Sequence, residues 1–337
     1  MNSRPADYES AALPLCYSSL LTLLFYYKQA IMSRGDFMNL CDERSVKRIM
    51  SMFSTGTKKS FGQNFLINPD VPYNIARESY EYHRQRNGAK KSAVIEIGPG
   101  IGSLTQELCG AYDKVIAVEI DKTLIPVLEY TLAEYDNVTV INDDFLKLDL
   151  ERLIKDELDG YEISVCANLP YYITTPIIMA LLENARREDG TSYFTSITVM
   201  VQKEVALRLC ATSKQADYGA ITASINYYGE IKKLFDVSPD NFLPSPKVTS
   251  SVVRIELYDA KRYEVKSEKM LHRVISGAFM QRRKTLLNSL SSAFAEVPKD
   301  VIAQIIERCG FDLTVRGERL SIEDFCRLSD EFAEAKK

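Results

Sequence analysis

The sequence predicts a doubly wound α/β domain that is followed by a small, all-helical domain. Between residues 92 and 168, four apolar stretches of strand length alternate with helical stretches, which is the pattern of a parallel sheet covered by helices. A glycine-rich turn joins the first of these strands to a helix. After about residue 260 only helical patterns remain. We therefore expect an N-terminal extension at 1–50, an α/β domain at 51–259 and a helical domain at 260–337.

The composition is that of an ordinary globular protein. The chain has 337 residues, of which 46% are hydrophobic, and a net charge of −4, so no global basic charge indicates a nucleic-acid partner. Seven cysteines are scattered without a C-x-x-C pair, and the two histidines, His83 and His272, lie far apart. This pattern favours free thiols in a reducing cytoplasm over disulfides, and it argues against a metal site.

The first 37 residues contain an apolar run, Leu20–Tyr27, that is shorter than the ~20 residues needed to span a bilayer. A basic segment and a cleavage site, the marks of a signal peptide, are missing. We expect a peripheral helix, or a natural start at Met32 or Met38, and no membrane contact.

The remaining elements follow from periodicity and end signals. A helix is expected at 42–52, with Asp42 as its N-cap. Residues 57–69 are neither helical nor alternating, and their lysines and amides suggest a binding loop, although such a stretch is more often plain surface loop. Residues 219–228 are a helix or an extended segment. Further helices are expected at about 69–86, 103–109, 124–135, 149–157, 176–185, 204–210, 267–276, 298–309 and 321–335, and strands at 92–97, 114–120, 138–142, 163–167, 195–201, 232–237 and 250–257.

The turn after the first strand is a candidate nucleotide loop. Gly98 and Gly100 let the backbone approach a ligand closely, and the helix that starts at Ser103 offers free N–H groups. The G-x-G-x-G spacing is not the full dinucleotide fingerprint, so a tight packing turn is the alternative. Glu119 ends the second strand, 17 residues after Gly102, where an acid can accept both hydroxyls of a ribose; the alternative is a solvated carboxylate. Together the loop and the acid favour a nucleoside cofactor.

Two further strand ends carry polar and aromatic side chains. Asp143 and Asp144 close the third strand, and an acid here can accept a hydrogen bond from an adenine amino group, with Phe145 beside the ring. The segment Asn168–Tyr171 places an amide, a rigid turn and a flat ring after the fourth strand. Read alone, this segment is more often a turn that starts a helix.

Methyl transfer from S-adenosylmethionine fits these parts better than hydride transfer does. A dehydrogenase usually needs a proton donor, and neither histidine falls at a strand end. The sulfonium already activates the methyl group, so the protein mainly positions a nucleophile. Acceptors on both N–H bonds of an adenine amine would free its lone pair, and Asn168 with a backbone carbonyl next to Pro170 could supply them. Tyr171 would stack on a flipped base.

A local basic excess lies in the second half of the chain. Across 241–293, Lys and Arg number 10, whereas Asp and Glu number 4, and Arg282–Lys284 is the densest point. Lys247 lies in a rigid, proline-rich loop that is either a binding loop or a simple connector. A solvated helix face is the usual meaning of such a run, but contact with an RNA backbone is the alternative.

Six motifs in one order resemble the KsgA-like ribosomal RNA adenine dimethyltransferases from about residue 55 to the end. The motifs are Phe61-Gly-Gln-Asn-Phe-Leu66, Glu96-Ile-Gly-Pro-Gly100, Glu119-Ile-Asp121, Asn168-Leu-Pro-Tyr171, Leu243-Pro-Ser-Pro-Lys-Val248 and Gln281-Arg-Arg-Lys-Thr285. The resemblance implies a Rossmann-like, S-adenosylmethionine-dependent methyltransferase sheet with a C-terminal helical domain. It implies dimethylation of two adjacent adenines near the 3′ end of small-subunit ribosomal RNA, in the assembling small ribosomal subunit.

The resemblance also assigns residues to roles. Matched by position, the cofactor contacts are Asn64, Leu66, Gly98, Gly100, Glu119, Asp144 and Asn168. The target-amine motif is Asn168, Leu169, Pro170 and Tyr171. From the basic excess we expect RNA contacts at Lys247, Arg282, Arg283 and Lys284. We expect a monomer that needs no metal.

The sequence departs from the family pattern at two places, and other families and functions are alternatives to this one. Tyr172 stands where many relatives carry asparagine, and residues 1–37 match nothing recognised. The large-subunit adenine methyltransferases that confer macrolide resistance usually have isoleucine at the position of Leu169 and lack the segment Gln281–Thr285. Mitochondrial transcription-factor relatives share the fold, but no transit peptide is evident. An RNA-binding assembly factor and a nicotinamide oxidoreductase are the alternatives from other classes.

Overall fold

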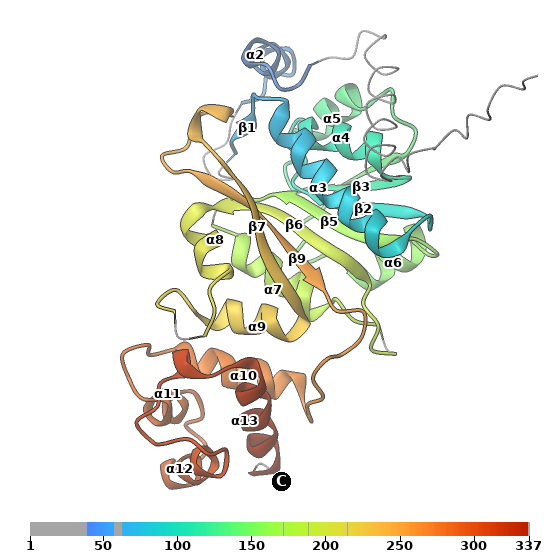
Figure 1. Cartoon of the computed structure of the whole chain (residues 1–337). Helices are drawn as coiled ribbons and strands as arrows, with labels where there is room; N and C mark the ends of the chain where they lie inside the picture. Colours follow the sequence, from blue (N-terminus) through green and yellow to red (C-terminus); the bar gives the residue numbers. More distant parts are fainter. Residues whose placement is uncertain (1–38, 57–62, 171, 188, 214, 336–337) are drawn as a thin grey trace, which may run out of the picture. The chain divides into compact units, whose positions relative to one another are not determined.

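The computed structural model describes residues 39–56, 63–170, 172–187, 189–213 and 215–335 (Figure 1). All of these residues belong to one compact unit that begins at Asn39. The predicted boundary at residue 50 falls within a helix of this unit, and the division at residue 260 stays a prediction. The expectations for residues 1–37 lie outside the described residues. Among the described residues, no helix is both long enough and apolar enough to cross a bilayer.

A seven-stranded sheet forms the centre of the α/β part, as the sequence predicts (Figure 1). Its strand order is β4-β3-β2-β5-β6-β9-β7; the first five strands are parallel, whereas β9 is antiparallel to both β6 and β7. The chain direction across the sheet reverses between β2 and β5, which is where such folds bind ligands. The strands are β2 (Ser92–Ile97), β3 (Lys114–Glu119), β4 (Val138–Asn142), β5 (Glu162–Asn168), β6 (Phe194–Gln202), β7 (Gly229–Val237) and β9 (Ser250–Leu257).

Helices connect and cover the strands. Every residue of β2 is buried, which explains why this strand shows no polar alternation. The Asp42 side chain caps α2 by accepting from the Ser45 backbone N–H, as predicted. Residues 220–228 form a helix, and α5 is shorter than expected. The helices of this part are α2 (Glu43–Met52), α3 (Asp70–Asn87), α4 (Ser103–Ala111), α5 (Ile125–Thr131), α6 (Leu150–Glu157), α7 (Thr174–Glu183), α8 (Lys203–Leu209) and α9 (Ala220–Tyr228).

Residues after 260 are helical, as the sequence predicts. Helix α10 packs against α9, α11 and α13, so the helical part is joined to the sheet part through α9 (Figure 1). Gly277 permits this close packing, because a Cβ there would lie 2.7 Å from the Cβ of Ala293. The helices are α10 (Glu268–Phe279), α11 (Leu286–Ala293), α12 (Lys299–Arg308) and α13 (Ile322–Ala335), and the short 3₁₀ helices are η2 (Pro239–Asn241) and η3 (Gly317–Arg319).

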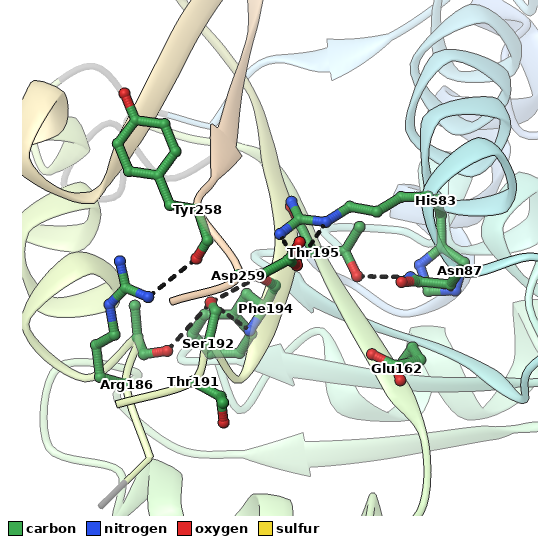
Figure 2. A network of polar contacts seen from close by, with 12 residues as sticks. His83, Asn87, Glu162, Arg186, Thr191, Ser192, Phe194, Thr195, Tyr258 and Asp259 are labelled. Carbon is green, nitrogen blue, oxygen red and sulfur yellow. Dashed lines mark hydrogen bonds and ion pairs between the residues drawn. The ribbon is translucent and has the colours of Figure 1, made fainter. Parts of the chain in front are cut away.

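A polar network holds the chain where it leaves β9 for the helical part (Figure 2). Arg186 donates to the Tyr258 carbonyl at 2.9 Å, and the Ser192 backbone N–H donates to the Asp259 carbonyl at 3.0 Å. Arg86, near the end of α3, forms an ion pair with the Asp259 carboxylate. These contacts lie near the start of β6, at the opposite end of the parallel strands from the glycine-rich turn.

The structure corrects one expectation about the loops. Phe65–Leu66 (β1) and Phe242–Leu243 (β8) pair as a two-stranded antiparallel sheet, so parts of two predicted loops form one element. The Ile67 backbone N–H extends the pairing by donating to the Asn241 carbonyl at 2.9 Å. Residues 57–62 of the predicted binding loop lie outside the described residues.

Candidate active site

A pocket opens at the carboxyl ends of the parallel strands, between the ends of β2 and β5. All seven residues that the sequence assigns to a cofactor line this pocket, together with three of the four that it assigns to the target amine. These residues are Asn64, Leu66, Gly98, Gly100, Glu119, Asp144, Asn168, Leu169 and Pro170. Tyr171, the fourth residue of that motif, lies outside the described residues. The fold thus brings the predicted site together, while the role of each residue stays a prediction.

The glycine-rich turn forms one wall of the pocket. Gly98 and Gly100 have φ angles of 72° and 64°, in the region that favours glycine. A Cβ on Gly100 would also lie 3.3 Å from the ring of Phe65, so a side chain there would crowd the pocket. Helix α4 begins at Ser103 without a side-chain cap. Its first N–H groups therefore remain available to a polar group of a ligand.

Glu119 ends β3 inside the pocket and is only 4% exposed. One of its oxygens accepts from the Gly100 backbone N–H at 3.2 Å, and the other accepts from the Asp121 backbone N–H at 2.8 Å. Burial raises the pKa of this carboxyl, and the backbone donors oppose that rise. The glutamate thus connects the glycine turn to the end of β3 and keeps its remaining acceptor capacity in the pocket.

Asp144 lies at the other side of the pocket, after β4. Its Oδ1 accepts from the Leu146 backbone N–H at 3.1 Å, and its Oδ2 is 3.1 Å from the ammonium of Lys147. Phe145 is buried beside it, whereas Ile120 and Leu146 keep 48% and 41% of their surface exposed. These apolar side chains and the acid suit a flat ring that carries an amino group.

Asn168 ends β5 and lines the pocket with a half-buried side chain. No other described residue forms a hydrogen bond with its amide. The turn that follows is fixed because the Ile173 backbone N–H donates to the Pro170 carbonyl at 3.1 Å. Leu169 is 2% exposed and anchors the turn in the core. The amide oxygen is therefore an acceptor held on a rigid element.

A buried glutamate that we did not single out also lines the pocket. Glu96 is 1% exposed, and its Oε2 has no hydrogen-bond partner among the described residues. Desolvation by burial, and then the nearby Glu119 carboxylate, raise the pKa of Glu96 to about 8. This unsatisfied oxygen is buried beside a second acid, so a hydrogen-bond donor of a ligand could satisfy it.

The structure adds Phe242 to the pocket from a distant part of the chain. Phe242 lies in β8 and is 3% exposed, and Phe65 of β1 lines the same wall. The only signal for Phe242 in the sequence is its place directly before the Leu243–Val248 motif. A phenylalanine at such a position more often belongs to the core than to a site.

The residues predicted to bind RNA lie outside the pocket. Lys247, Arg283 and Lys284 are exposed and form no ion pair with another described residue. Arg282, in the turn between α10 and α11, donates to the backbone carbonyls of Ala216 and Tyr218, the latter at 3.1 Å. Arg282 therefore ties the helical part to the segment before α9, whatever its contact with RNA.

The donor set of the pocket fits S-adenosylmethionine. The pocket offers acids for a ribose and for an adenine amino group, free N–H groups at a helix start, and an unsatisfied buried carboxyl that could accept from the ammonium group of the cofactor. Among the described residues, no group of three histidines, cysteines or acids could hold a metal ion.

Comparisons with known proteins agree with this geometry. The family model described as ribosomal RNA adenine dimethylase matches residues 55–334. A "Ribosomal RNA small subunit methyltransferase A" of Lachnoclostridium phytofermentans is 43% identical over 300 residues, which cover 88% of this chain and 99% of that protein. A protein with the same name from Clostridioides difficile is 41% identical over 294 residues, covering 86% of this chain and 96% of that protein.

Two solved structures share the fold. A dimethyladenosine transferase from Plasmodium falciparum has a TM-score of 0.62 at 24% identity, covering 80% of this chain and 98% of that chain. The 23S ribosomal RNA methyltransferase ErmE has a TM-score of 0.55 at 23% identity, covering 80% of this chain and all of that chain. The predicted methyltransferase fold is therefore confirmed, and with the family match the chain belongs to the ribosomal RNA adenine dimethylase family.

Proposed function

We propose that the chain transfers methyl groups from S-adenosylmethionine to the exocyclic amines of two adjacent adenines near the 3′ end of small-subunit ribosomal RNA. The observation that carries this proposal is the similarity of the chain to small-subunit methyltransferases; the match covers 99% of the Lachnoclostridium phytofermentans protein. The pocket that brings the motif residues together supports the same conclusion. The substrate is the assembling small ribosomal subunit. The enzyme acts as a monomer in the cytoplasm, where its six described free cysteines stay reduced.

The pocket residues divide the work of binding and positioning. S-adenosylmethionine, when bound, supplies a methyl group that its sulfonium has already activated. Glu119 would accept the ribose hydroxyls, and Asp144 would accept from the adenine amino group of the cofactor. The glycine turn and the start of α4 would hold its amino-acid end.

Asn168 would prepare the acceptor. The lone pair of an adenine amine is delocalised into the ring, so the amine is a poor nucleophile. The Asn168 amide oxygen and a backbone carbonyl next to Pro170 would accept hydrogen bonds from its two N–H groups, which favours a tetrahedral nitrogen with a free lone pair. Phe242 offers an apolar wall for the base, and Tyr171 remains our predicted stacking residue. A strong general base is not needed.

Exposed lysine and arginine side chains would contact the phosphates of the RNA backbone. Lys247, Arg283 and Lys284 are free to neutralise phosphates, and each neutralised phosphate releases counterions. The salt bridges elsewhere on the helical part engage most of its other lysines and arginines within the chain.

We expect cofactor binding to depend on pH through Glu96. This carboxyl has a pKa of about 8 in the free enzyme and should be mostly protonated at neutral pH. A cationic cofactor favours its ionised form, so binding should release a proton and should strengthen as pH rises toward the free-enzyme pKa. Calorimetry with S-adenosylhomocysteine, which keeps the ammonium group, should show roughly ten-fold tighter binding at pH 8 than at pH 6.5.

Two variants give this expectation a control. Glu96→Gln cannot ionise and should bind with an almost flat pH profile, without the proton release that buffers of different ionisation enthalpy reveal. Glu162→Gln changes a glutamate at the opposite end of the sheet and should keep the wild-type slope. A wild-type affinity that is unchanged between pH 6.5 and 8 would show that Glu96 does not sense the cofactor.

Mapping of dimethyladenine in ribosomal RNA tests the proposed function directly. Small-subunit RNA from cells that lack this gene should carry two adjacent unmethylated adenines near its 3′ end, and the purified chain should methylate both in subunits from those cells. Dimethylation that persists without the gene, or that disappears from large-subunit RNA instead, would refute the proposal.

A further inference from the structure

Tyr172 is the most exposed aromatic residue of the pocket. Its side chain keeps 62% of its surface in solvent although it lines the pocket. The other aromatic side chains of the pocket, Phe65, Phe145 and Phe242, are 6%, 8% and 3% exposed. No other described residue stacks on the Tyr172 ring or forms a hydrogen bond with its hydroxyl. The Tyr172 ring is therefore available to a partner that enters the pocket.

The local backbone fixes this position. The hydrogen bond from the Ile173 N–H to the Pro170 carbonyl closes the turn, and the Thr174 hydroxyl donates to the same carbonyl at 3.4 Å. Helix α7 starts at Thr174, which is 2% exposed. The outward position of Tyr172 is thus set by a closed turn between a strand and a helix.

The other exposed apolar side chains of the pocket belong to its cofactor side. Ile120 and Leu146 follow β3 and β4, next to Glu119 and Asp144. Tyr172 follows β5, four residues after Asn168, on the side where the acceptor amine must lie for the proposed reaction. A macromolecular substrate must reach the pocket from the solvent side. The exposed Tyr172 ring can contact such a substrate, whereas the buried aromatic rings of the pocket walls cannot.

We propose that Tyr172 is a stacking platform for the RNA base next to the adenine that occupies the pocket. This inference rests on the proposed function, in which two adjacent adenines are methylated. Extrusion of one adenine removes a stacking partner from its neighbour, and that neighbour then needs another surface. A tyrosine ring provides one to any base, since every base has a π-face. Tyr172 would thereby position the strand without touching the reacting amine.

Steady-state methylation of unmethylated small subunits tests this role. Tyr172→Ala should lower kcat/KM roughly 10- to 100-fold, mostly through KM, whereas Tyr172→Phe, which keeps the ring, should stay within about two-fold of the wild type. The control is Tyr130→Ala, because Tyr130 is a 45% exposed tyrosine on α5 outside the pocket; its ring contacts only Phe53 among the aromatic rings of the described residues, and the variant should keep the wild-type kcat/KM. The melting temperature and the affinity for S-adenosylhomocysteine should be unchanged in Tyr172→Ala.

A change in the RNA separates base stacking from other roles. Replacing one adenine of the pair by uridine, which stacks less well, should slow methylation of the remaining adenine by the wild type. The same replacement should have a much smaller effect on Tyr172→Ala, because the contact is already lost. Equal effects of the replacement on both enzymes, or wild-type kcat/KM in Tyr172→Ala, would overturn the inference while leaving the proposed function intact.

Two further outcomes also count against it. A large loss of S-adenosylhomocysteine affinity in Tyr172→Ala would assign the ring to the cofactor instead of to RNA. A wild-type enzyme that does not methylate small subunits would overturn the proposed function, and this inference with it.

Discussion

Replacement of Asn168 by alanine should lower methyl transfer by roughly 10²- to 10³-fold while S-adenosylhomocysteine and the small subunit still bind. The alanine removes the amide oxygen that would accept from the adenine amine. Removal of one preorganised group that acts in the transition state typically costs this much. Few other contacts should change, since no other described residue forms a hydrogen bond with this amide. The loss should appear in kcat more than in KM.

Single-turnover methylation measures the loss of methyl transfer, and filter binding measures the affinity for the small subunit. Asn168→Asp keeps an acceptor oxygen and should retain more activity than the alanine variant. Asn184→Ala is the matched control, because Asn184 is an exposed asparagine at the end of α7 that does not line the pocket. Unchanged methylation by Asn168→Ala would refute the proposed mechanism. Lost methylation with retained subunit binding would fit both the enzymatic role and a separate role in subunit assembly.

The parts of the fold that could be predicted from the sequence are those with a long local signal. The strand Ser92–Ile97 is predicted at its observed bounds, because its buried residues show no polar alternation before Glu96. The positions of Gly98, Glu119 and Asn168 in one pocket follow from topology, since parallel strands end at the same edge of a sheet.

The parts that could not be predicted depend on contacts between distant segments. Strands β1 and β8 have two residues each, so neither has a period, and their pairing joins positions 65 and 243. The wall formed by Phe242 was missed for this reason. The basic run predicts an RNA contact at Arg282, and only the folded chain shows its hydrogen bonds to the backbone carbonyls before α9.

Glu96 illustrates another limit of sequence reasoning. In the sequence, Glu96 is the first polar residue after the apolar part of its strand and the first residue of the Glu96–Gly100 motif, and neither position predicts a raised pKa. Only its burial, its unsatisfied oxygen and the adjacent Glu119 carboxylate reveal an acid with a raised pKa. A spacing pattern contains no information about desolvation, which is the largest cause of that shift.

Replacement of Glu119 by glutamine should weaken the binding of S-adenosylhomocysteine by roughly 100-fold. Both carboxylate oxygens accept backbone N–H groups, from Gly100 and from Asp121, while facing the pocket. The amide nitrogen of glutamine cannot accept, so either the glycine turn loses its anchor or a ribose hydroxyl loses its acceptor. Charge-assisted hydrogen bonds contribute about 1.5–3 kcal/mol each, and about 2.7 kcal/mol corresponds to a 100-fold change in affinity.

The control for Glu119→Gln is Asp113→Asn, which changes another carboxylate that accepts from a backbone N–H but lies far from the pocket. Asp113 accepts from the Ser92 backbone N–H at 2.8 Å, at the opposite end of the sheet. Asp113→Asn should lower the melting temperature of the free protein but keep the full stabilisation by S-adenosylhomocysteine, whereas Glu119→Gln should lose most of that stabilisation. Equal ligand-induced shifts in the two variants would mean that Glu119 only anchors the turn. The ribose acceptor would then have to be another group of the pocket.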